Sequence, residues 1–363
     1  MSIKHAEEYR DRELSKSLIQ KIHQNSHRPL RLMEVCGTHT VSIFKNGIRS
    51  ILPETVSLLS GPGCPVCVTA QGEIDAFIEL SREKNVIITT FGDLMRIPGS
   101  DSSLQKERAN GRDIRIVYSA FDALEIARNH PDREVVFLGV GFETTAPTIA
   151  ASVLSAQAMN LKNLSVISAH KQVVPALNAL MQTREVRIDG FLLPGHVSVI
   201  IGAGAYRDFI RHHPIPCVIT GFEPVDILSG IHMLVRQIDT GRNILENAYP
   251  RAVSETGNAK AKALLKTVFQ SGDTVWRGIG SIPDSGLFFQ QAFENFDAAK
   301  RFRISYRQTP EPRGCACGEI LTGVKIPPDC ALYKKTCTPL HPIGPCMVSS
   351  EGTCAAYYKY HGG

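Results

Sequence analysis

Several features of common protein classes are missing from this chain of 363 residues. It has no apolar run of about 18 residues, so no membrane-spanning helix is expected. Its 40 Lys and Arg residues are scattered and the net charge is only +5, which does not indicate a nucleic-acid partner. The beginning, MSIKHAEEYRDRELSKSLIQ, is charged and amphipathic and is unlike a secretory signal. The sequence therefore predicts a cytoplasmic protein.

Motifs for nucleotide and radical chemistry are missing as well. There is no G-x-x-x-x-G-K-[ST] phosphate loop, and Gly139-Val-Gly141 lacks the third glycine of a dinucleotide-binding fingerprint. The C-x-x-x-C-x-x-C arrangement of radical-forming enzymes does not occur. The unusual chemistry of this chain must therefore come from other residues.

Cysteine is the residue type with the most informative distribution. In a cytoplasmic chain, clustered thiols serve metal or redox chemistry more often than static disulfides. One of the ten, Cys217, lies in an apolar run and is expected to be a buried structural thiol. The other nine form an early group and a late group within the last 49 residues: Cys36, Cys64 and Cys67, then Cys315, Cys317, Cys330, Cys337, Cys346 and Cys354.

Short apolar runs that alternate with amphipathic segments predict an α/β fold. Such alternation is typical of βαβ units with parallel sheets. We expect two similar α/β domains, residues 30–118 and 119–222, and a mostly helical, cysteine-rich domain made of residues 1–29 with 223–363. A helix over about 6–24 is expected to pack on this third domain. The predicted strands are 30–35, 56–59, 86–90, 114–118, 135–140, 165–168, 191–193 and 217–220.

Unusual polar residues come directly after several of these predicted strands. In open parallel sheets, ligands bind outside the carboxyl ends of the strands. The side chains are therefore expected to line one shared cleft, or two clefts that face each other. Some of them would serve equally well as turn or cap residues. The residues that matter most are Cys36, His39, Cys64, Cys67, Glu143 and His196.

Two motifs in the early group offer reactive sulfur. Cys64-Pro-Val-Cys67 can close a disulfide on a strand-to-helix turn, and no second C-x-x-C completes a zinc site, so redox use is favoured over zinc. Cys36-Gly-Thr-His39 brings a thiolate and an imidazole together, which suits iron. A nucleophilic cysteine activated by histidine, or a buried cysteine beside a loop histidine, remains an alternative for this second motif.

The late cysteines do not have the spacing of common metal sites. Neither the paired knuckles of a zinc ribbon nor a compact ferredoxin run is present. Four widely spaced cysteines remain available for an iron–sulfur cluster, which leaves two thiols over. Only one residue separates Cys315 from Cys317, and this short spacing makes it difficult for both thiols to ligate the same cluster.

Taken together, these motifs resemble those of the HypD family of [NiFe]-hydrogenase maturation factors. The resemblance rests on Cys36-Gly-Thr-His39-Thr, Gly61-Pro-Gly-Cys64-Pro-Val-Cys67, Gly141-Phe-Glu-Thr-Thr145 and Leu193-Pro-Gly-His196-Val-Ser. It extends over about residues 30–360. The cluster motif of the family, C-x14-C-x6-C-x16-C, is matched by Cys315, Cys330, Cys337 and Cys354, and the remaining pair, Cys317 and Cys346, matches its second redox dithiol.

The resemblance implies a redox-active assembly scaffold rather than a conventional turnover enzyme. It implies a [4Fe-4S] cluster in the third domain, a small HypC-type chaperone as partner, and a HypE-type donor of cyanide. Together these proteins hold an iron that acquires one CO and two cyanide ligands before delivery to the hydrogenase large subunit. No nucleic-acid or membrane partner is implied.

Individual roles follow from this resemblance and from thiol chemistry. Cys36 is expected to ligate the iron of the Fe(CN)2CO group, with His39 near it. Cys64 and Cys67 are expected to form a dithiol–disulfide couple, and Cys317 with Cys346 a relay. Two further site residues are expected, Glu143 and His196, which would position the iron ligands or move protons.

Two other hypotheses about the function of the same residues remain open. An iron–sulfur-dependent disulfide reductase would use the cluster to reduce Cys64–Cys67, with Cys36 forming a mixed disulfide to a protein substrate. Such a reductase needs no metal at Cys36. A zinc-binding structural protein is the third reading, and it would contain no iron.

Overall fold

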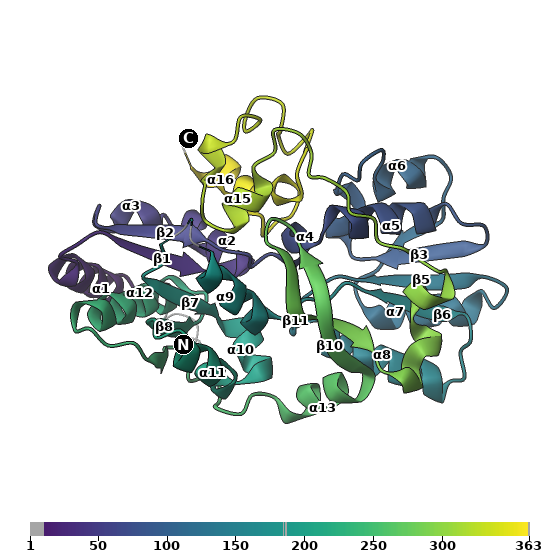
Figure 1. The fold of residues 1–363 in the computed structure, drawn as a ribbon, viewed down its shortest axis with the longest axis horizontal. Coiled ribbons are helices and arrows are strands. Elements are labelled where there is room, and N and C mark those ends of the chain that lie inside the picture. Colours follow the sequence, from purple (N-terminus) through teal and green to yellow (C-terminus); the bar gives the residue numbers. More distant parts are fainter. Residues whose placement is uncertain (1–10, 184, 186, 362–363) are drawn as a thin grey trace.

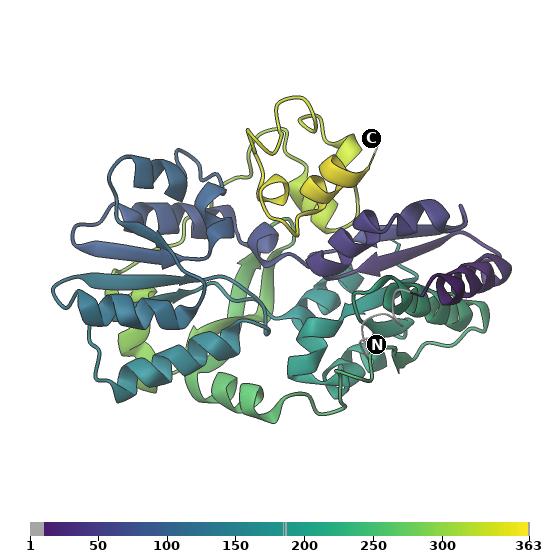
Figure 2. The same ribbon diagram turned by 180° about the vertical axis from the view of Figure 1, so that it is seen from behind.

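The computed structural model describes residues 11–183, 185 and 187–361. Two parallel β-sheets lie side by side with an antiparallel hairpin between them, and a loop-rich C-terminal lobe covers the junction (Figure 1). Figure 2 shows the two sheets, the hairpin and the C-terminal lobe from behind. In the described ranges, no helix combines the length and the apolar character needed to cross a membrane. The predicted α/β class with two parallel sheets is confirmed.

The first sheet has five parallel strands in the order β2-β1-β7-β8-β9. Its inner strands are short, mostly apolar runs buried on both faces, as expected for a parallel sheet between helices, whereas the edge strand β9 is only half-buried. Helix α1 packs against α12 on this sheet. The elements are α1 (Arg12–Asn25), β1 (Leu30–Glu34), α2 (Gly37–Lys45), α3 (Ile48–Ile51), β2 (Val56–Ser60), α4 (Pro65–Val68), β7 (Gly190–Pro194), α10 (Gly195–Ile201), η3 (Ala203–Tyr206), α11 (Arg207–His212), β8 (Cys217–Thr220), α12 (Pro224–Asp239) and β9 (Leu245–Asn247).

The second sheet has four parallel strands in the order β4-β3-β5-β6. Helices α7 and α8 pack together against it. The core of this body is built from apolar residues of β5 and α8. The elements are α5 (Gln71–Ser81), β3 (Val86–Thr90), η2 (Gly92–Arg96), α6 (Leu104–Ala109), β4 (Ile114–Ile116), α7 (Ala120–Asn129), β5 (Glu134–Gly139), α8 (Ala146–Ala158) and β6 (Leu164–Ser168). Helix α9 (Val173–Gln182) follows β6 in the chain but packs against α11 beside the first sheet (Figure 1).

The predicted domain boundary near Ser119 does not match the sheets. All eight predicted strands are present, but β3 and β4 pair with β5 and β6, while β7 and β8 return to pair with β1. The chain therefore begins in the first sheet, builds the whole second sheet, and then completes the first. Apolar runs identify buried strands, but they do not say which strands are neighbours.

The third predicted region, 1–29 with 223–363, is also divided differently. Helices α1 and α12 belong to the first sheet rather than to the cysteine-rich part. The predicted N-terminal helix begins at Arg12, and its expected first turn, 6–10, lies outside the described residues. The region also contains strands that were not predicted. After β9 come α13 (Ala259–Val268), β10 (Phe269–Trp276), β11 (Gly280–Phe289), η4 (Gln291–Phe296) and α14 (Ala298–Arg301).

The hairpin of β10 and β11 contacts all three parts of the molecule (Figure 1). Trp276 forms a β-bridge with Thr69, which follows the first sheet's α4, and Gly286 forms one with Lys171 at the end of the second sheet. At the tip, a Cβ on Gly278 would lie 2.2 Å from the Cα of Gly318 in the C-terminal lobe. The hairpin therefore fixes the three parts relative to one another.

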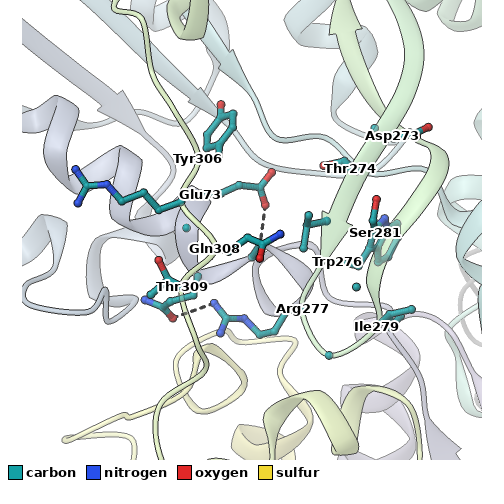
Figure 3. Close-up of a pocket in the computed structure, with 18 of the residues that line it drawn as sticks. Glu73, Asp273, Thr274, Trp276, Arg277, Ile279, Ser281, Tyr306, Gln308 and Thr309 are labelled. Carbon is teal, nitrogen blue, oxygen red and sulfur yellow. Dashed lines mark hydrogen bonds between the residues drawn. The ribbon is translucent and has the colours of Figure 1, made fainter.

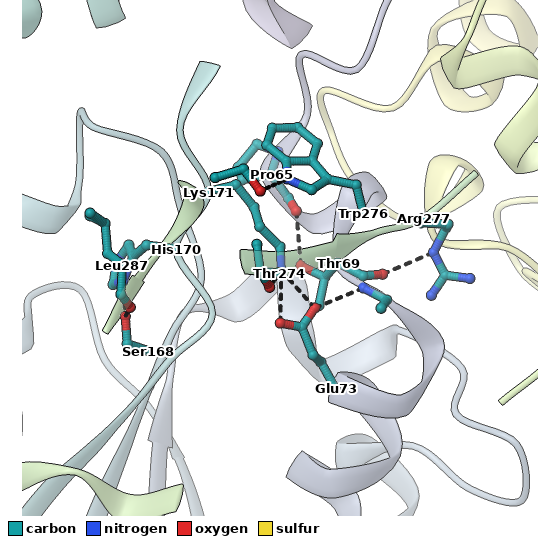
Figure 4. A network of polar contacts seen from close by, with 12 residues as sticks. Pro65, Thr69, Glu73, Ser168, His170, Lys171, Thr274, Trp276, Arg277 and Leu287 are labelled. Atoms are coloured by element: carbon teal, nitrogen blue, oxygen red, sulfur yellow. Dashed lines mark hydrogen bonds and ion pairs between the residues drawn. The ribbon is translucent and has the colours of Figure 1, made fainter. Parts of the chain in front are cut away.

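A buried ion pair anchors the hairpin to the second body (Figure 4). The Lys171 side chain is 1% exposed and donates to both carboxylate oxygens of Glu73, at 2.8 and 3.0 Å, and to Thr274 Oγ1 at 2.9 Å. Glu73 also accepts from the backbone N–H of Ala70 at the start of α5. One buried ammonium thus joins α5 and β10.

The C-terminal lobe consists mostly of turns around short helices. An extended segment, 302–314, leads from α14 into it. Between this segment and the hairpin lies a cavity of about 720 Å³, lined by Glu73, Trp276, Arg277 and Tyr306 among others and by none of the cysteines (Figure 3). The lobe's elements are α15 (Cys317–Leu321), η5 (Pro327–Asp329), η6 (Pro345–Met347) and α16 (Thr353–Tyr360).

Removal of the Lys171 ammonium should destabilise the folded protein strongly. Lys171→Met leaves the Glu73 carboxylate buried without its partner, so the free energy of unfolding should fall by about 3–5 kcal/mol. Urea unfolding followed by circular dichroism measures this change. In the double variant Lys171→Met/Glu73→Gln, which keeps the α5 cap but removes the charge, most of the loss should be recovered. Equal destabilisation of the single and double variants would contradict this account.

Candidate functional site

Cys36 lies in the loop between β1 and α2, as the sequence predicted. It is the residue before α2 and has an extended backbone, with φ of −153°. The residue is only 8% exposed. Burial raises the pKa of its thiol to about 12, and a backbone hydrogen bond from His39 opposes this shift only in part. Without a cation beside it, Cys36 is therefore a neutral thiol at physiological pH.

The Cys64–Cys67 loop lies directly against the Cys36 loop. Strands β1 and β2 pair in parallel with Glu34 opposite Ser60, so both loops leave the same edge of the sheet. The N–H of Gly37 donates to the carbonyl of Gly63 at 2.9 Å. A Cβ on Gly63 would lie 2.1 Å from the backbone nitrogen of Cys36. Only glycine permits this approach between the two backbones.

Cys64 and Cys67 are joined by a disulfide, with their Cα atoms 5.2 Å apart. Cys64 caps the single turn of α4, and Pro65 occupies the first helical position, which suits its fixed φ. The N–H of Cys67 donates to the Sγ of Cys64 at 3.2 Å. Both residues are buried. The bond therefore sits under the surface, next to Cys36.

Glu34 is a site residue that sequence reasoning missed. Its carboxyl is fully buried, and it accepts from Thr40 Oγ1 at 2.5 Å and from the Cys36 N–H at 3.3 Å. Burial raises its pKa to about 7, although the hydrogen bond from Thr40 lowers it. The only signal was an acidic residue within the apolar run Leu30–Val35, where buried charge is costly.

Two histidines flank one aromatic ring beside this edge. The Nε2 of His39 lies 2.9 Å from the carbonyl oxygen of Gly221 and therefore carries the proton, which leaves Nδ1 buried without a partner. Burial lowers the pKa of His39 to about 4. Phe222 lies against His39 in a tilted arrangement with 4.8 Å between ring centroids, and it stacks on the exposed His196 at 3.8 Å. The sequence predicted both histidines but not the phenylalanine between them.

Glu143 lies on the other sheet, in the loop between β5 and α8. One carboxylate oxygen accepts from the N–H of Val173 at 3.0 Å, and the other is buried without a partner. Burial raises its pKa to about 7. The buried phenol of Tyr206 has its pKa raised by burial, and the charges of both Glu143 and Cys36 add to this effect. Glu143 therefore comes from the second sheet, whereas the Cys36 and Cys64 loops leave the first.

All six late cysteines line one small closed cavity. Its other walls are apolar and include Ile320, Leu332 and Met347, and its volume is only about 10 Å³. The sulfur atoms of Cys317 and Cys346 approach to 2.7 Å. Within the described ranges, no three His, Cys, Asp or Glu side chains converge closely enough to hold a metal ion. The set is rich in soft thiol ligands of the kind that iron–sulfur clusters use.

The cysteine-rich lobe, defined here as residues 315–361, touches the Cys36 and Cys64 loops. Thr38 Oγ1 donates to a carboxylate oxygen of Glu351 at 2.6 Å. Ser349 Oγ lies 3.3 Å from the Sγ of Cys64. Burial raises the pKa of Glu351. Neither lobe residue was predicted, because no motif marks a side chain whose partner is about 300 positions away.

The fold and the site define a class of protein in which a buried cysteine, a C-x-x-C disulfide and a lobe of six thiols meet at one sheet edge. A family model described as "Hydrogenase formation hypA family" matches residues 13–361. The chain therefore belongs to the HypD family of hydrogenase maturation factors, as the sequence motifs predicted.

Curated relatives resemble the chain over nearly its full length. "Hydrogenase maturation factor HypD" of Cupriavidus necator is 45% identical over 99% of this chain and 97% of its own. The protein of the same name from Azotobacter vinelandii is 46% identical, again over 99% and 97%. The one from Escherichia coli is 44% identical over 98% and 97%. Hydrogenase maturation is therefore the process in which this chain takes part.

The raised pKa of Glu143 gives a pH dependence with a defined sign. The folded protein holds this proton more tightly than the unfolded chain, whose carboxyl titrates near 4.5. Its contribution to stability is fully present below pH 4.5 and is lost as the pH rises through about 7. Glu143→Gln should therefore gain stability relative to the parent over this window, by up to about 3 kcal/mol.

The difference in unfolding free energy between the two proteins, measured at several pH values, isolates this effect. Burial lowers the pKa of His39 and His170, which gives a dependence of opposite sign, but that contribution is common to both proteins and cancels. A difference that does not change with pH would show that Glu143 titrates normally.

Proposed function

We propose that this chain is a redox-active scaffold on which the iron of [NiFe]-hydrogenase acquires one CO and two cyanide ligands. It would act with a small HypC-type chaperone and a HypE-type cyanide donor, and the iron group would pass to the hydrogenase large subunit. The observation that carries the proposal is the direct backbone contact between the Cys36 and Cys64 loops beneath the cysteine-rich lobe.

In this proposal Cys36 is the protein ligand of the cargo iron. Iron carrying CO and cyanide is a soft, low-spin centre for which a thiolate is a suitable ligand. The thiol has a pKa of about 12, so the bound cation would have to displace its proton. The unpartnered Nδ1 of His39 and the carboxyl of Glu34, which bonds the Cys36 N–H, are groups close by that can accept a proton.

The burial of Cys36 favours the scaffold over a disulfide reductase. A cysteine that forms mixed disulfides with protein substrates needs an exposed thiolate with a lowered pKa. Cys36 is 8% exposed, and burial raises its pKa. These are the properties of a protected metal ligand rather than of a nucleophile.

The resident cofactor of the proposal is a [4Fe-4S] cluster held by Cys315, Cys330, Cys337 and Cys354. When bound, it would supply or accept electrons one at a time. The other two thiols of the same cavity, Cys317 and Cys346, are close enough to pair and would act as the relay. Helix α4, which carries Cys67, packs against both α15 and η6, which carry the relay thiols.

Glu143 and His196 are proposed to move protons or to position the iron's ligands. A carboxyl with a pKa of about 7 gives and takes a proton readily at physiological pH. His196 is exposed at the end of β7, and its ring stacks on Phe222, which fixes its orientation.

The cluster assignment predicts different effects for two classes of cysteine variant. Cys330→Ala should bleach the visible absorbance and lower the content from about four irons per chain, because a metal site in a loop-rich segment contributes folding energy. Cys317→Ala should keep the cluster. Iron, sulfide and zinc analysis of anaerobically purified protein measures both. Normal iron in Cys330→Ala, or loss of colour in Cys317→Ala, would mean that a different set of four thiols binds the cluster.

The iron-ligand assignment predicts the infrared spectrum of the complex with the small partner. Cys36→Ala should lose the bands of iron-bound CO and cyanide, because the neighbouring Cys64 and Cys67 serve as the redox couple in this proposal, while the cluster absorbance stays unchanged. Cys36→Ser should retain at most a trace. Full-strength bands in Cys36→Ala together with their loss in Cys64→Ala would assign the iron to the other motif.

A further inference from the structure

One hydroxyl of the cysteine-rich lobe contacts the disulfide directly. In the sequence, Ser349 comes after Cys346, one of the two proposed relay thiols, and before Cys354. The residue is 2% exposed. Its Oγ is 3.3 Å from the Sγ of Cys64. None of the roles assigned above uses this residue, although it forms the shortest polar link between the lobe and the C-x-x-C motif.

The direction of this hydrogen bond is fixed by its surroundings. The N–H of Glu351 donates to Ser349 Oγ at 3.2 Å, so the hydroxyl oxygen is already an acceptor. A disulfide sulfur carries no proton, so the hydroxyl proton of Ser349 is the one that lies between Oγ and Cys64. Ser349 is therefore the donor.

The two sulfur atoms of the disulfide have unequal surroundings. Cys64 Sγ accepts from Ser349 and from the N–H of Cys67, at 3.3 and 3.2 Å. No hydrogen bond to the Sγ of Cys67 is found among the described residues. Hydrogen bonds to an ionised acceptor are stronger than those to a neutral one. Negative charge is therefore accommodated better on Cys64 than on Cys67.

We propose that Ser349 stabilises the reduced form of the couple by donating to a Cys64 thiolate, and so sets the couple's reduction potential from the lobe. This rests on the proposed redox role of Cys64 and Cys67. A dithiol is the reductant. It provides two electrons and closes to a disulfide, and the Cys64–Cys67 bond breaks. One of its protons goes to Cys67 and the other to solvent, while Cys64 keeps the negative charge.

The arrangement links the couple to the position of the lobe. Ser349 reaches Cys64 only while the lobe lies on the Cys36 and Cys64 loops, where Thr38 also bonds Glu351. Loss of this contact would remove the donor and make the disulfide harder to reduce. The couple is therefore a stronger oxidant when the lobe is in contact with the site.

The test is an equilibrium titration of the purified, cluster-containing full chain in anaerobic mixtures of oxidised and reduced dithiothreitol. After an acid quench and alkylation, mass spectrometry reads the tryptic peptide 50–82, which contains Cys64 and Cys67 and no other cysteine. In Ser349→Ala, the equilibrium should move toward the disulfide by roughly 10- to 100-fold, equal to about 30–60 mV more negative. Ser350→Ala, which removes the neighbouring exposed hydroxyl, is the matched control and should titrate like the parent.

A second pair of variants separates the effect of the hydroxyl donor from the effect of side-chain shape. Ser349→Thr keeps the hydroxyl donor, whereas Ser349→Val removes it, and the two new side chains have nearly the same volume. Only Ser349→Val should therefore shift the reduction potential of the Cys64–Cys67 couple. Iron content confirms that the cluster is intact in each. A parent-like potential in both Ser349→Ala and Ser349→Val, or equal shifts in Ser349→Thr and Ser349→Val, would overturn the inference.

This readout is independent of the cargo iron. A shifted potential in a protein complex that never shows CO and cyanide bands would refute the proposed function and leave the role of Ser349 standing. Normal bands with an unshifted potential would refute the role of Ser349 alone.

Discussion

The parallel pairing of β1 with β2 is the constraint on which the site depends. Because Glu34 lies opposite Ser60, both strands end at the same level and both loops leave the sheet together. The absence of a side chain at Gly63 then lets the second loop rest on the backbone of Cys36. The spacing between the thiol and the disulfide is therefore set by sheet hydrogen bonds. A movement between the two α/β bodies would not separate them, since both loops belong to one sheet.

The hairpin between the sheets transmits this constraint to the lobe. It forms β-bridges at Thr69 and Lys171, one on each body, and its tip packs on Gly318 of α15. Next to the tip, the buried Arg277 donates to the carbonyl of Thr69 at 3.0 Å and pairs with Glu311 of the segment that enters the lobe. The thiols of the lobe are thus held above the C-x-x-C turn by backbone contacts and buried charge.

The sequence allowed the strands and the motif residues to be predicted, because each depends on local chemistry. Apolar runs end where Cys36 and Cys64 begin, and that pattern is visible in one dimension. Strand pairing is not local, so the return of β7 to β1 was missed, and with it the domain boundary. The hairpin was missed for a related reason: β10 reads FQSGDTVW, and most of its residues are exposed or half-buried, which leaves no apolar alternation to detect.

Cys36 and Cys64 are neighbours with opposite electrostatic surroundings. This difference supports the proposal that the two sulfur atoms have different chemical roles. Burial keeps Cys36 protonated until a cation replaces its proton, so it is inert toward thiol exchange but suited to hold a metal. Cys64 has two hydrogen-bond donors on its sulfur, which favour the charge that appears when a disulfide is reduced. Under the proposed function, one sheet edge would thus hold a metal ligand beside a redox couple, because burial disfavours the Cys36 thiolate while two hydrogen-bond donors favour a Cys64 thiolate.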